Sequence, residues 1–283
     1  MAKYLVTGGA GFIGSNLVDK LVSQDHQVEV WDNLSTGKES NVHNASFYYV
    51  DVGNGIQNVD VGIYDAIFHL AGEARIQPSF NRPVECHKSN VTGTLNILEL
   101  ARKYQVPVVY AGSSSVYSNQ YSSPYTFTKA KAEEYCWLYN KVYGVPVAIA
   151  RFFNVYGPRQ ILQGPYATVI GIFEQQKLNN LPLTITGDGD QRRDFTHVED
   201  VCDGLIAITK DKAYGEMYDF GSGKNYSINE VAKMFDSSIE YIPARRGEAR
   251  DTLANINFTN SVLDWNPKKS LSEYISNFIS TVK

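Results

Sequence analysis

The chain has 283 residues, of which 43% are hydrophobic and 20% charged, and its formal net charge is −4. These values are ordinary for a globular protein and allow one large domain or two unequal ones. Basic residues form no long block, only the pairs Arg192-Arg193 and Arg245-Arg246, which argues against a broad nucleic-acid-binding surface. Such pairs suit a small polyanion such as a diphosphate, with solvated turn arginines as the alternative.

The cysteines Cys86, Cys136 and Cys202 are far apart and form no C-x-x-C pattern. This favours reduced thiols in a cytoplasmic protein over a metal site or a disulfide framework. The first residues enter a strand almost at once, so we expect no signal peptide. No apolar run approaches the ~18 residues that a membrane span needs, so no membrane partner is expected.

The chain begins with a short apolar strand at 4–7, a glycine-rich turn, and a helical pattern from about 12 to 22. Gly8, Gly11 and Gly14 allow a tight turn, a close backbone approach and close packing of helix on strand. The helix N-terminus then offers free N–H groups to a phosphate. The order strand, glycines, helix predicts a dinucleotide site.

A second strand at 27–32 ends in Asp32, close to the ~20 residues past the glycines where a carboxylate holds the adenosine ribose. A carboxylate there would repel a 2′-phosphate, which favours NAD over NADP. Asp32 as a simple turn or capping residue is the alternative. The absence of G-K-[ST] after the glycines excludes a nucleotide triphosphatase.

Third and fourth strands are expected at 47–52 and 66–71. Asp51 is placed to reach the adenine edge. Small residues after the fourth strand would let a pyrophosphate or a nicotinamide ribose lie close. His69, inside an apolar strand, is expected to be a buried, hydrogen-bonded core residue rather than a base.

A long helix is predicted at about 83–104, with Asn90 inside it, followed by a fifth strand at 106–111. The serines at 113–115 come directly after that strand. Hydroxyls at the carboxyl end of a parallel strand lie where ligands bind in open α/β sheets.

The next helix begins at about Pro124 and ends near Gly144. It places Tyr125 and Lys129 four residues apart on one face. A phenol is a poor base at neutral pH because its pKa is near ~10, but a neighbouring ammonium favours the phenolate. The pair makes sense as a proton-transfer device, with a chance pairing of a tyrosine and a solvated lysine as the alternative.

A sixth strand is expected at 147–153. The alternation of strands and helices predicts an α/β fold, a Rossmann-type doubly wound parallel sheet with a smaller mixed α/β substrate-binding domain at the C-terminal end. Gly, Pro and Gln become frequent at 154–165. We therefore expect an NAD-binding domain at 1–155, rejoined by parts of 190–222, and a substrate-binding domain at 156–283.

Eight motifs resemble those of the extended short-chain dehydrogenase/reductase family, specifically its NAD-dependent nucleotide-sugar epimerases, and most closely the UDP-hexose 4-epimerases. The resemblance covers nearly the whole chain. The motifs are TGGAGFIG (7–14), DNLSTG (32–37), HLAG (69–72), NVTGT (90–94), SSSVY (113–117), PYTFTK (124–129), RFFNVYGPR (151–159) and GDGDQRRDFTHV (187–198).

The resemblance implies three catalytic residues: Tyr125 as the base, Lys129 as a ligand of the nicotinamide ribose that lowers the pKa of the tyrosine, and Ser113 as a hydrogen-bond partner of the sugar O4. The cofactor-binding residues are expected to be Gly8, Gly11, Phe12, Ile13, Gly14, Asp32, Asn33, Ser35, Thr36, Gly37, Asp51, Val52, Leu70, Ala71, Gly72, Asn90, Tyr125 and Lys129. The substrate-binding residues are expected to be Ser113, Ser114, Ser115, Asn154, Arg193, Arg245, Glu248 and Thr252. No metal site is expected.

The reaction implied is 4-epimerisation of a UDP-sugar through a 4-keto intermediate. Related 4,6-dehydratases carry Asp-Glu where this chain has Ser114-Ser115, and related decarboxylases carry Glu at the position of Ser115. Neither carboxylate is present, which disfavours both reactions; a 4-keto reductase and a non-catalytic NAD-binding scaffold remain alternatives. In the epimerases that the chain resembles, a bulky tyrosine at the position of Thr252 restricts the pocket to plain hexoses. Because threonine is smaller, UDP-GlcNAc/UDP-GalNAc are expected as substrates in addition to UDP-Glc/UDP-Gal.

Two features depart from the family pattern: only twelve positions separate Ser113 from Tyr125, about half the usual number, and Ser118 replaces a glycine. A more open cleft is therefore expected. The helices at about 83–104 and 125–143 carry more apolar residues than one core face needs. In the epimerases that the chain resembles, these helices form a four-helix dimer interface, so a homodimer is expected.

Overall fold

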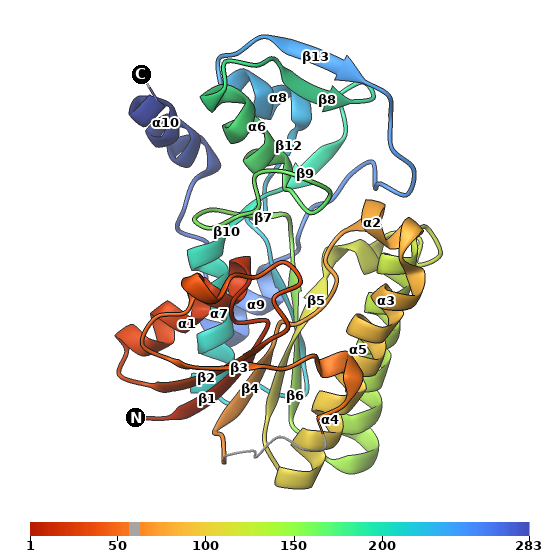
Figure 1. Ribbon diagram of the computed structural model, residues 1–283, viewed down its shortest axis with the longest axis vertical. Coiled ribbons are helices and arrows are strands. Elements are labelled where there is room, and N and C mark those ends of the chain that lie inside the picture. Colours follow the sequence, from red (N-terminus) through yellow and green to blue (C-terminus); the bar gives the residue numbers. More distant parts are fainter. Residues whose placement is uncertain (57–62, 283) are drawn as a thin grey trace.

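The computed structural model describes residues 1–56 and 63–282. Its largest element is a seven-stranded sheet with the order β11-β6-β5-β4-β1-β2-β3, in which every neighbouring pair is parallel (Figure 1). The strands are β1 (Lys3–Thr7), β2 (Gln27–Asp32), β3 (Ser46–Tyr49), β4 (Ala66–His69), β5 (Val108–Ser113), β6 (Val147–Phe152) and β11 (Met217–Phe220). The predicted doubly wound parallel sheet is confirmed.

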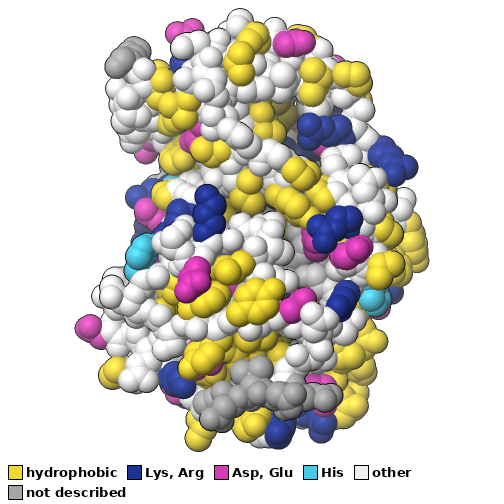
Figure 2. Space-filling view, viewed as in Figure 1, with side chains coloured by type: hydrophobic (Ala, Val, Ile, Leu, Met, Phe, Trp, Pro, Cys, Tyr) yellow, Lys and Arg dark blue, Asp and Glu magenta, His cyan; other side chains and the backbone are white. Residues whose placement is uncertain are grey.

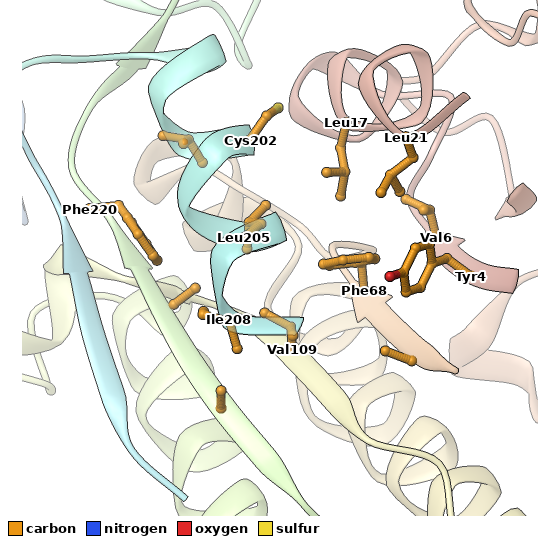
Figure 3. Packing of buried hydrophobic residues seen from close by; sticks show 14 of the residues in the cluster. Tyr4, Val6, Leu17, Leu21, Phe68, Val109, Cys202, Leu205, Ile208 and Phe220 are labelled. Atoms are coloured by element: carbon orange, nitrogen blue, oxygen red, sulfur yellow. The ribbon is translucent and has the colours of Figure 1, made fainter. Parts of the chain in front are cut away.

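Helices cover both faces of this sheet. The helices α1 (Phe12–Ser23) and α7 (Val198–Lys210) pack on one face, and α4 (Gly93–Tyr104) and α5 (Pro124–Tyr143) on the other. Because side chains alternate along a strand, Tyr4 and Val6 of β1 contact the first pair and Leu5 the second. Figure 3 shows the first of these cores, where side chains of α1 and α7 meet those of the strands.

A smaller group of elements lies above the carboxyl ends of the strands (Figure 1). It contains three two-stranded sheets and has its own buried core around Phe173 and Phe235. Its elements are β7 (Val155–Tyr156), β8 (Leu183–Thr186), β9 (Arg192–Asp194), β10 (Thr196–His197), β12 (Asn225–Ser227), β13 (Ile239–Ile242), α6 (Val169–Leu178), α8 (Ile228–Met234) and α10 (Leu271–Val282).

The chain returns to the large sheet after its first visit to the smaller group, because α7 packs on the sheet and β11 pairs with β6. The short helix α9 (Asn257–Leu263) contacts β11. The domain boundary at residue 155 stays a prediction. No helix in the described ranges is long and apolar enough to cross a membrane.

The segment expected to be one helix at 83–104 is not regular throughout. It consists of α3 (Pro83–His87), a π-helical turn (Lys88–Thr92) and α4, and it follows the short helix α2 (Ile76–Asn81). The sequence pattern did not reveal this wider turn, which lies at Asn90. The remaining short elements are the 3-10 turns Glu39–Asn41, Val52–Asn54 and Ser114–Tyr117.

The order of the strands creates the crevice in which the site lies. The chain runs from β1 outward to β2 and β3 on one side, and through β4, β5 and β6 on the other. Connections therefore leave β1 and β4 in opposite directions, and a gap opens at the carboxyl ends of these neighbouring strands.

Candidate active site

Residues from both parts of the chain line one cavity of about 460 Å³. In the space-filling view, apolar side chains gather across the middle of the face of the molecule that is turned to the viewer, with Lys and Arg side chains beside them (Figure 2). Every predicted catalytic and substrate-binding residue lines the cavity, and so do the predicted cofactor-binding residues except Gly37 and Asn90.

The glycine-rich turn forms one end of the cavity. Gly8 has a φ of 71°, a conformation that favours glycine. A Cβ on Gly14 would lie 2.1 Å from the carbonyl oxygen of Gly8, so the first turn of α1 packs directly on the loop. No side chain caps this helix, and its first turn holds no acidic residue, so its N–H groups suit an anion.

Asp32 ends β2 beside the glycines. Its carboxylate accepts hydrogen bonds from the backbone N–H groups of Ala10, at 3.0 Å, and Leu34, at 2.8 Å. Burial raises the pKa of this carboxyl, while the two backbone hydrogen bonds lower it. Gly37 packs against the loop, where a Cβ would stand 2.8 Å from the carbonyl carbon of Ala10, and it does not line the cavity, so its cofactor contact stays a prediction.

Tyr125 and Ser113 meet at the carboxyl end of β5. Ser123 caps α5 by accepting a hydrogen bond from the N–H of Thr126, and Pro124 follows it, so Tyr125 stands in the first turn. The Tyr125 hydroxyl donates to Ser113 Oγ at 3.1 Å, and Ser113 Oγ also accepts from the N–H of Ser115. A phenol and a hydroxyl thus converge on one point of the cavity.

Lys129 lies one turn further along α5 and is buried. Its ammonium donates to the carbonyl oxygen of Ala111 at 2.9 Å and to the Tyr110 hydroxyl at 3.3 Å. Burial lowers the pKa of Lys129 to about 8. Both of these hydrogen bonds hold Lys129 against β5, and neither of them is to the phenol of Tyr125.

The expected lowering of the Tyr125 pKa by Lys129 is not what the structure shows. Burial raises the pKa of Tyr125 above its ordinary value. The hydrogen bond with Ser113 and the charge of Arg75 oppose that rise. The electrostatic partners of the phenol include a cation that the sequence pattern did not single out.

Asn90 lies beneath the cavity rather than on its wall, because the π-helical turn buries its side chain. Its amide nitrogen donates to the carbonyl oxygen of Glu73 and to Thr128 Oγ1, both at 3.1 Å. Its Oδ1 is buried without a hydrogen-bond partner in the described part of the chain. That oxygen is 2.7 Å from where a Cβ on Gly72 would be, so Gly72 alone separates it from the cavity wall.

His69 is a core residue, as expected. Its Nδ1 lies 2.7 Å from Thr7 Oγ1 and its Nε2 3.1 Å from Thr94 Oγ1. Burial, together with the charge of Lys129, lowers the pKa of His69 to about 3. The imidazole is therefore neutral at physiological pH.

The far end of the cavity holds the residues predicted to bind the substrate. Asn154, with a φ of 30°, donates to the carbonyl oxygen of Asp194 at 2.7 Å. Arg193 lies 3.8 Å from the carboxylate of Glu248, and burial lowers the pKa of Arg193. The Thr252 hydroxyl accepts from Asn154 Nδ2 and from the N–H of Asp194, both at 3.4 Å.

Sequence reasoning missed several polar cavity residues, among them Arg75, Tyr166 and Gln191. Arg75 Nε donates to the carbonyl oxygen of Tyr166 at 2.9 Å, which ties the segment after β4 to the segment after β7. The position of Arg75 soon after a buried parallel strand was a usable signal. Nothing local to Tyr166 or Gln191 marks them.

A buried ion pair lies near the predicted catalytic residues. Arg151, at the end of β6, donates from its η nitrogen to Glu133 of α5 at 2.5 Å. The guanidinium also lies over the ring of Tyr117, 4.4 Å from its centroid, and Tyr117 donates to Asp219 of β11 at 2.8 Å. These contacts join α5 to the ends of β6 and β11, which lie on one side of the strand that ends in Ser113.

The profile of the NAD dependent epimerase/dehydratase family matches residues 4–221. The chain belongs to this family. A putative UDP-glucose 4-epimerase of Methanocaldococcus jannaschii is 35% identical over 99% of this chain and 98% of its own length.

Other members of the family differ in reaction. A UDP-N-acetyl-alpha-D-glucosaminuronate decarboxylase of Bacillus cytotoxicus is 34% identical over 81% of this chain and 78% of its own length. Among solved structures, the UDP-glucose 4-epimerase of Thermotoga maritima with UDP-glucose has a TM-score of 0.89 at 31% identity, over 99% of this chain and all of that one. The protein is thus an NAD-dependent nucleotide-sugar enzyme.

The glycine end of the cavity fits the NAD of this epimerase/dehydratase family. A Cβ on Gly8 would lie 2.7 Å from the backbone nitrogen of Ala71, so only glycine lets the loop close against the end of β4. The N–H groups at the start of α1 would hold the pyrophosphate and Asp32 the adenosine ribose. Lys129 lies beyond the end of β4, on the side of the cavity away from Asp32. Its Nζ would be 3.6 Å from a Cβ on Gly72.

Proposed function

We propose that this protein is a 4-epimerase of a UDP-sugar. The observation that carries the proposal is the 3.1 Å hydrogen bond between Tyr125 and Ser113, in the same cavity as the glycine-rich turn. A proton acceptor and a hydroxyl partner at one point suit the oxidation of an alcohol, which breaks the O–H bond of the hydroxyl and the C–H bond of the carbon that carries it.

Tyr125 is the general base in this mechanism. Its phenolate form is opposed by burial and favoured by the hydrogen bond with Ser113. As phenolate it accepts the proton of the sugar 4-hydroxyl while Ser113 holds that oxygen, and the hydrogen on C4 leaves as hydride, giving a 4-keto sugar. Bound NAD supplies the acceptor of this hydride and its donor in the return step. The keto sugar turns over in the cavity, receives the hydride on its other face, and recovers its proton from Tyr125.

The far end of the cavity anchors the rest of the substrate. Arg193 and Arg245 offer positive charge for a diphosphate, and Glu248 offers a carboxylate for a ribose hydroxyl. Anchoring there supplies binding energy remote from the reacting carbon, which allows the sugar to turn without leaving. Thr252 is small, which supports acceptance of UDP-N-acetylhexosamines beside UDP-glucose and UDP-galactose.

Decarboxylation is the competing reaction, because a decarboxylase is among the relatives. Oxidation of a uronate at C4 gives a β-keto acid, which loses carbon dioxide readily. The 3-10 turn after β5 carries Ser114 and Ser115 and no carboxylate, which supports epimerisation over this reaction.

The test is conversion of UDP-glucose, UDP-GlcNAc and UDP-glucuronate followed by NMR, with the wild type and with Tyr125→Phe. The variant removes the proton acceptor, so we expect turnover to fall by roughly 10²–10⁴-fold with bound NAD retained. Tyr121→Phe is the matched control, because Tyr121 is 72% exposed. Equal turnover of both variants would remove Tyr125 from the mechanism. A wild type that binds NAD but converts no sugar would support the scaffold alternative.

A homodimer is the second part of this proposal. Large apolar side chains on the outer side of α3, α4 and α5 are exposed, among them Val84 (74%), Val142 (61%), Tyr143 (48%) and Leu138 (45%). These helices lie together at one edge of the molecule (Figure 1). We expect a dimer by light scattering at micromolar concentration and a monomer for Val142→Glu, because a charge on this face opposes its burial. A monomeric wild type would contradict the proposal.

A further inference from the structure

Arg75 is a cavity residue to which the proposed mechanism assigns no task. It lies six residues past His69, the end of β4, and its partly buried side chain lines the cavity. Its Nε donates to the carbonyl oxygen of Tyr166 at 2.9 Å. The guanidinium is therefore fixed in place through one nitrogen.

The charge of Arg75 has no carboxylate partner among the described residues. Its one hydrogen bond there is to Tyr166, and it takes part in no ion pair. The nearest acid in sequence, Glu73, accepts from the Tyr166 hydroxyl at 2.6 Å and lies 3.6 Å from Arg82. Burial lowers the pKa of Arg75, as expected for a cation taken from water without a counter-ion.

Three other cations line the cavity: Arg245 is exposed to solvent, and the other two have partners in the described part of the chain. Arg193 lies beside Glu248, and Lys129 is held by the carbonyl oxygen of Ala111. Arg75 is instead close enough to Tyr125 for its charge to lower the pKa of that phenol. Its tie to Tyr166 also holds it against the segment after β7, not against the glycine-rich turn. The cation thus stands at the reacting end of the cavity.

We propose that Arg75 binds a carboxylate on the sugar ring of the substrate, so that this site takes a nucleotide-linked hexuronate. The inference rests on the proposed function and narrows its sugar. A guanidinium fixed through Nε leaves two η nitrogens, which match the two oxygens of a carboxylate. A carboxylate there would neutralise the desolvated positive charge of Arg75, whereas the hydroxyls of a neutral sugar would only donate or accept hydrogen bonds.

The first experiment needs no variant. Wild-type protein is given UDP-glucuronate, UDP-glucose and UDP-glucuronamide, in which an amide replaces the carboxylate. We expect kcat/KM for UDP-glucuronate to exceed those for the two neutral sugars by on the order of 100-fold, as for a charge-assisted pair in a cavity. Equal values for the acid and the amide would overturn the inference.

The second experiment compares Arg75→Gln with Arg82→Gln. Arg82 is a matched control, because it also contacts Tyr166, through the Tyr166 hydroxyl and not the backbone, and it does not line the cavity. We expect Arg75→Gln to lower kcat/KM for UDP-glucuronate by roughly 100-fold and for UDP-glucose by less than about threefold, with bound NAD unchanged. Arg82→Gln should lower neither.

Other outcomes separate the two proposals. If Arg75→Gln slows both sugars equally and shifts the pH profile of kcat, Arg75 serves Tyr125 and the inference fails. Loss of NAD from this variant would also overturn it. If UDP-glucose is epimerised and UDP-glucuronate is ignored, the inference fails while the proposed function stands. If UDP-glucuronate gives a UDP-pentose only, and Arg75→Gln abolishes that, the inference stands and 4-epimerisation fails.

Discussion

The two ends of the cavity are built in different ways. At the glycine end, the chain between Gly8 and Asp32 forms the wall largely with its own backbone, and Asp32 is held by the N–H groups of Ala10 and Leu34. At the other end, contacts join residues far apart in sequence, with 91 positions between Arg75 and Tyr166 and 169 between Gln77 and Arg246. Backbone geometry tolerates little change, whereas side chains on separate segments change one at a time. We therefore expect substitutions to change sugar specificity more readily than cofactor binding.

The largest effect is expected from Gly14→Val at the glycine end. Its Cβ would stand 2.1 Å from the carbonyl oxygen of Gly8, and backbone cannot move aside as a side chain does. We expect at least a tenfold loss of bound NAD, measured by cofactor release and absorbance. Gly11→Ala is the graded control, because its nearest atom would be 3.3 Å away. Equal NAD content in both variants would contradict the idea that close packing forms this wall.

A smaller effect is expected at His69, which is buried at the end of β4 and does not line the cavity. Its folded pKa of about 3 is below the ordinary 6.5, so between these pH values only the unfolded chain binds the proton, and stability falls as pH falls. We expect a loss of about 2 kcal/mol between pH 7 and pH 5 from this group, measured by urea unfolding. His69→Gln should remove that part of the slope. His43→Gln, at a side chain that is 61% exposed, should keep it; equal slopes for the two variants would refute the assignment.

The smallest effect is expected at the substrate end, in the loop at 243–249 that carries Arg245 and Glu248. Gln77 of α2 donates to the carbonyl oxygen of Arg246 at 2.9 Å, and the Arg246 guanidinium lies 3.8 Å from the centroid of the Phe80 ring. Gln77→Ala removes one exposed hydrogen bond, so we expect KM for the UDP-sugar to rise about threefold with bound NAD unchanged.

Gln105→Ala provides the control for this change. Gln105 makes the same kind of exposed hydrogen bond, to the carbonyl oxygen of Arg102 at 2.7 Å, but at the end of α4 and not on the cavity wall. Its KM should equal that of the wild type. A fall in NAD content for Gln77→Ala would show that the two ends are not separable.

The sequence alone determined six of the seven strands of the large sheet, the glycine-rich turn, Asp32 and the position of Tyr125, but not β11. Each depends on short-range features: alternation along a strand, glycines where the backbone packs closely, and a Ser-Pro helix start one residue before the tyrosine. Such features are complete within a few residues, so they are visible without the fold.

Only the tertiary structure decided what surrounds those residues. Asn90 does not line the cavity because it lies buried in a π-helical turn, and Gly37 does not because it packs against Ala10. Arg75 lines the cavity and is held there by its hydrogen bond to the carbonyl oxygen of Tyr166. The pKa of Tyr125 is raised by burial, which no local sequence pattern reveals. Burial and charge depend on the distance between segments remote in sequence, and that distance exists only once the chain has folded.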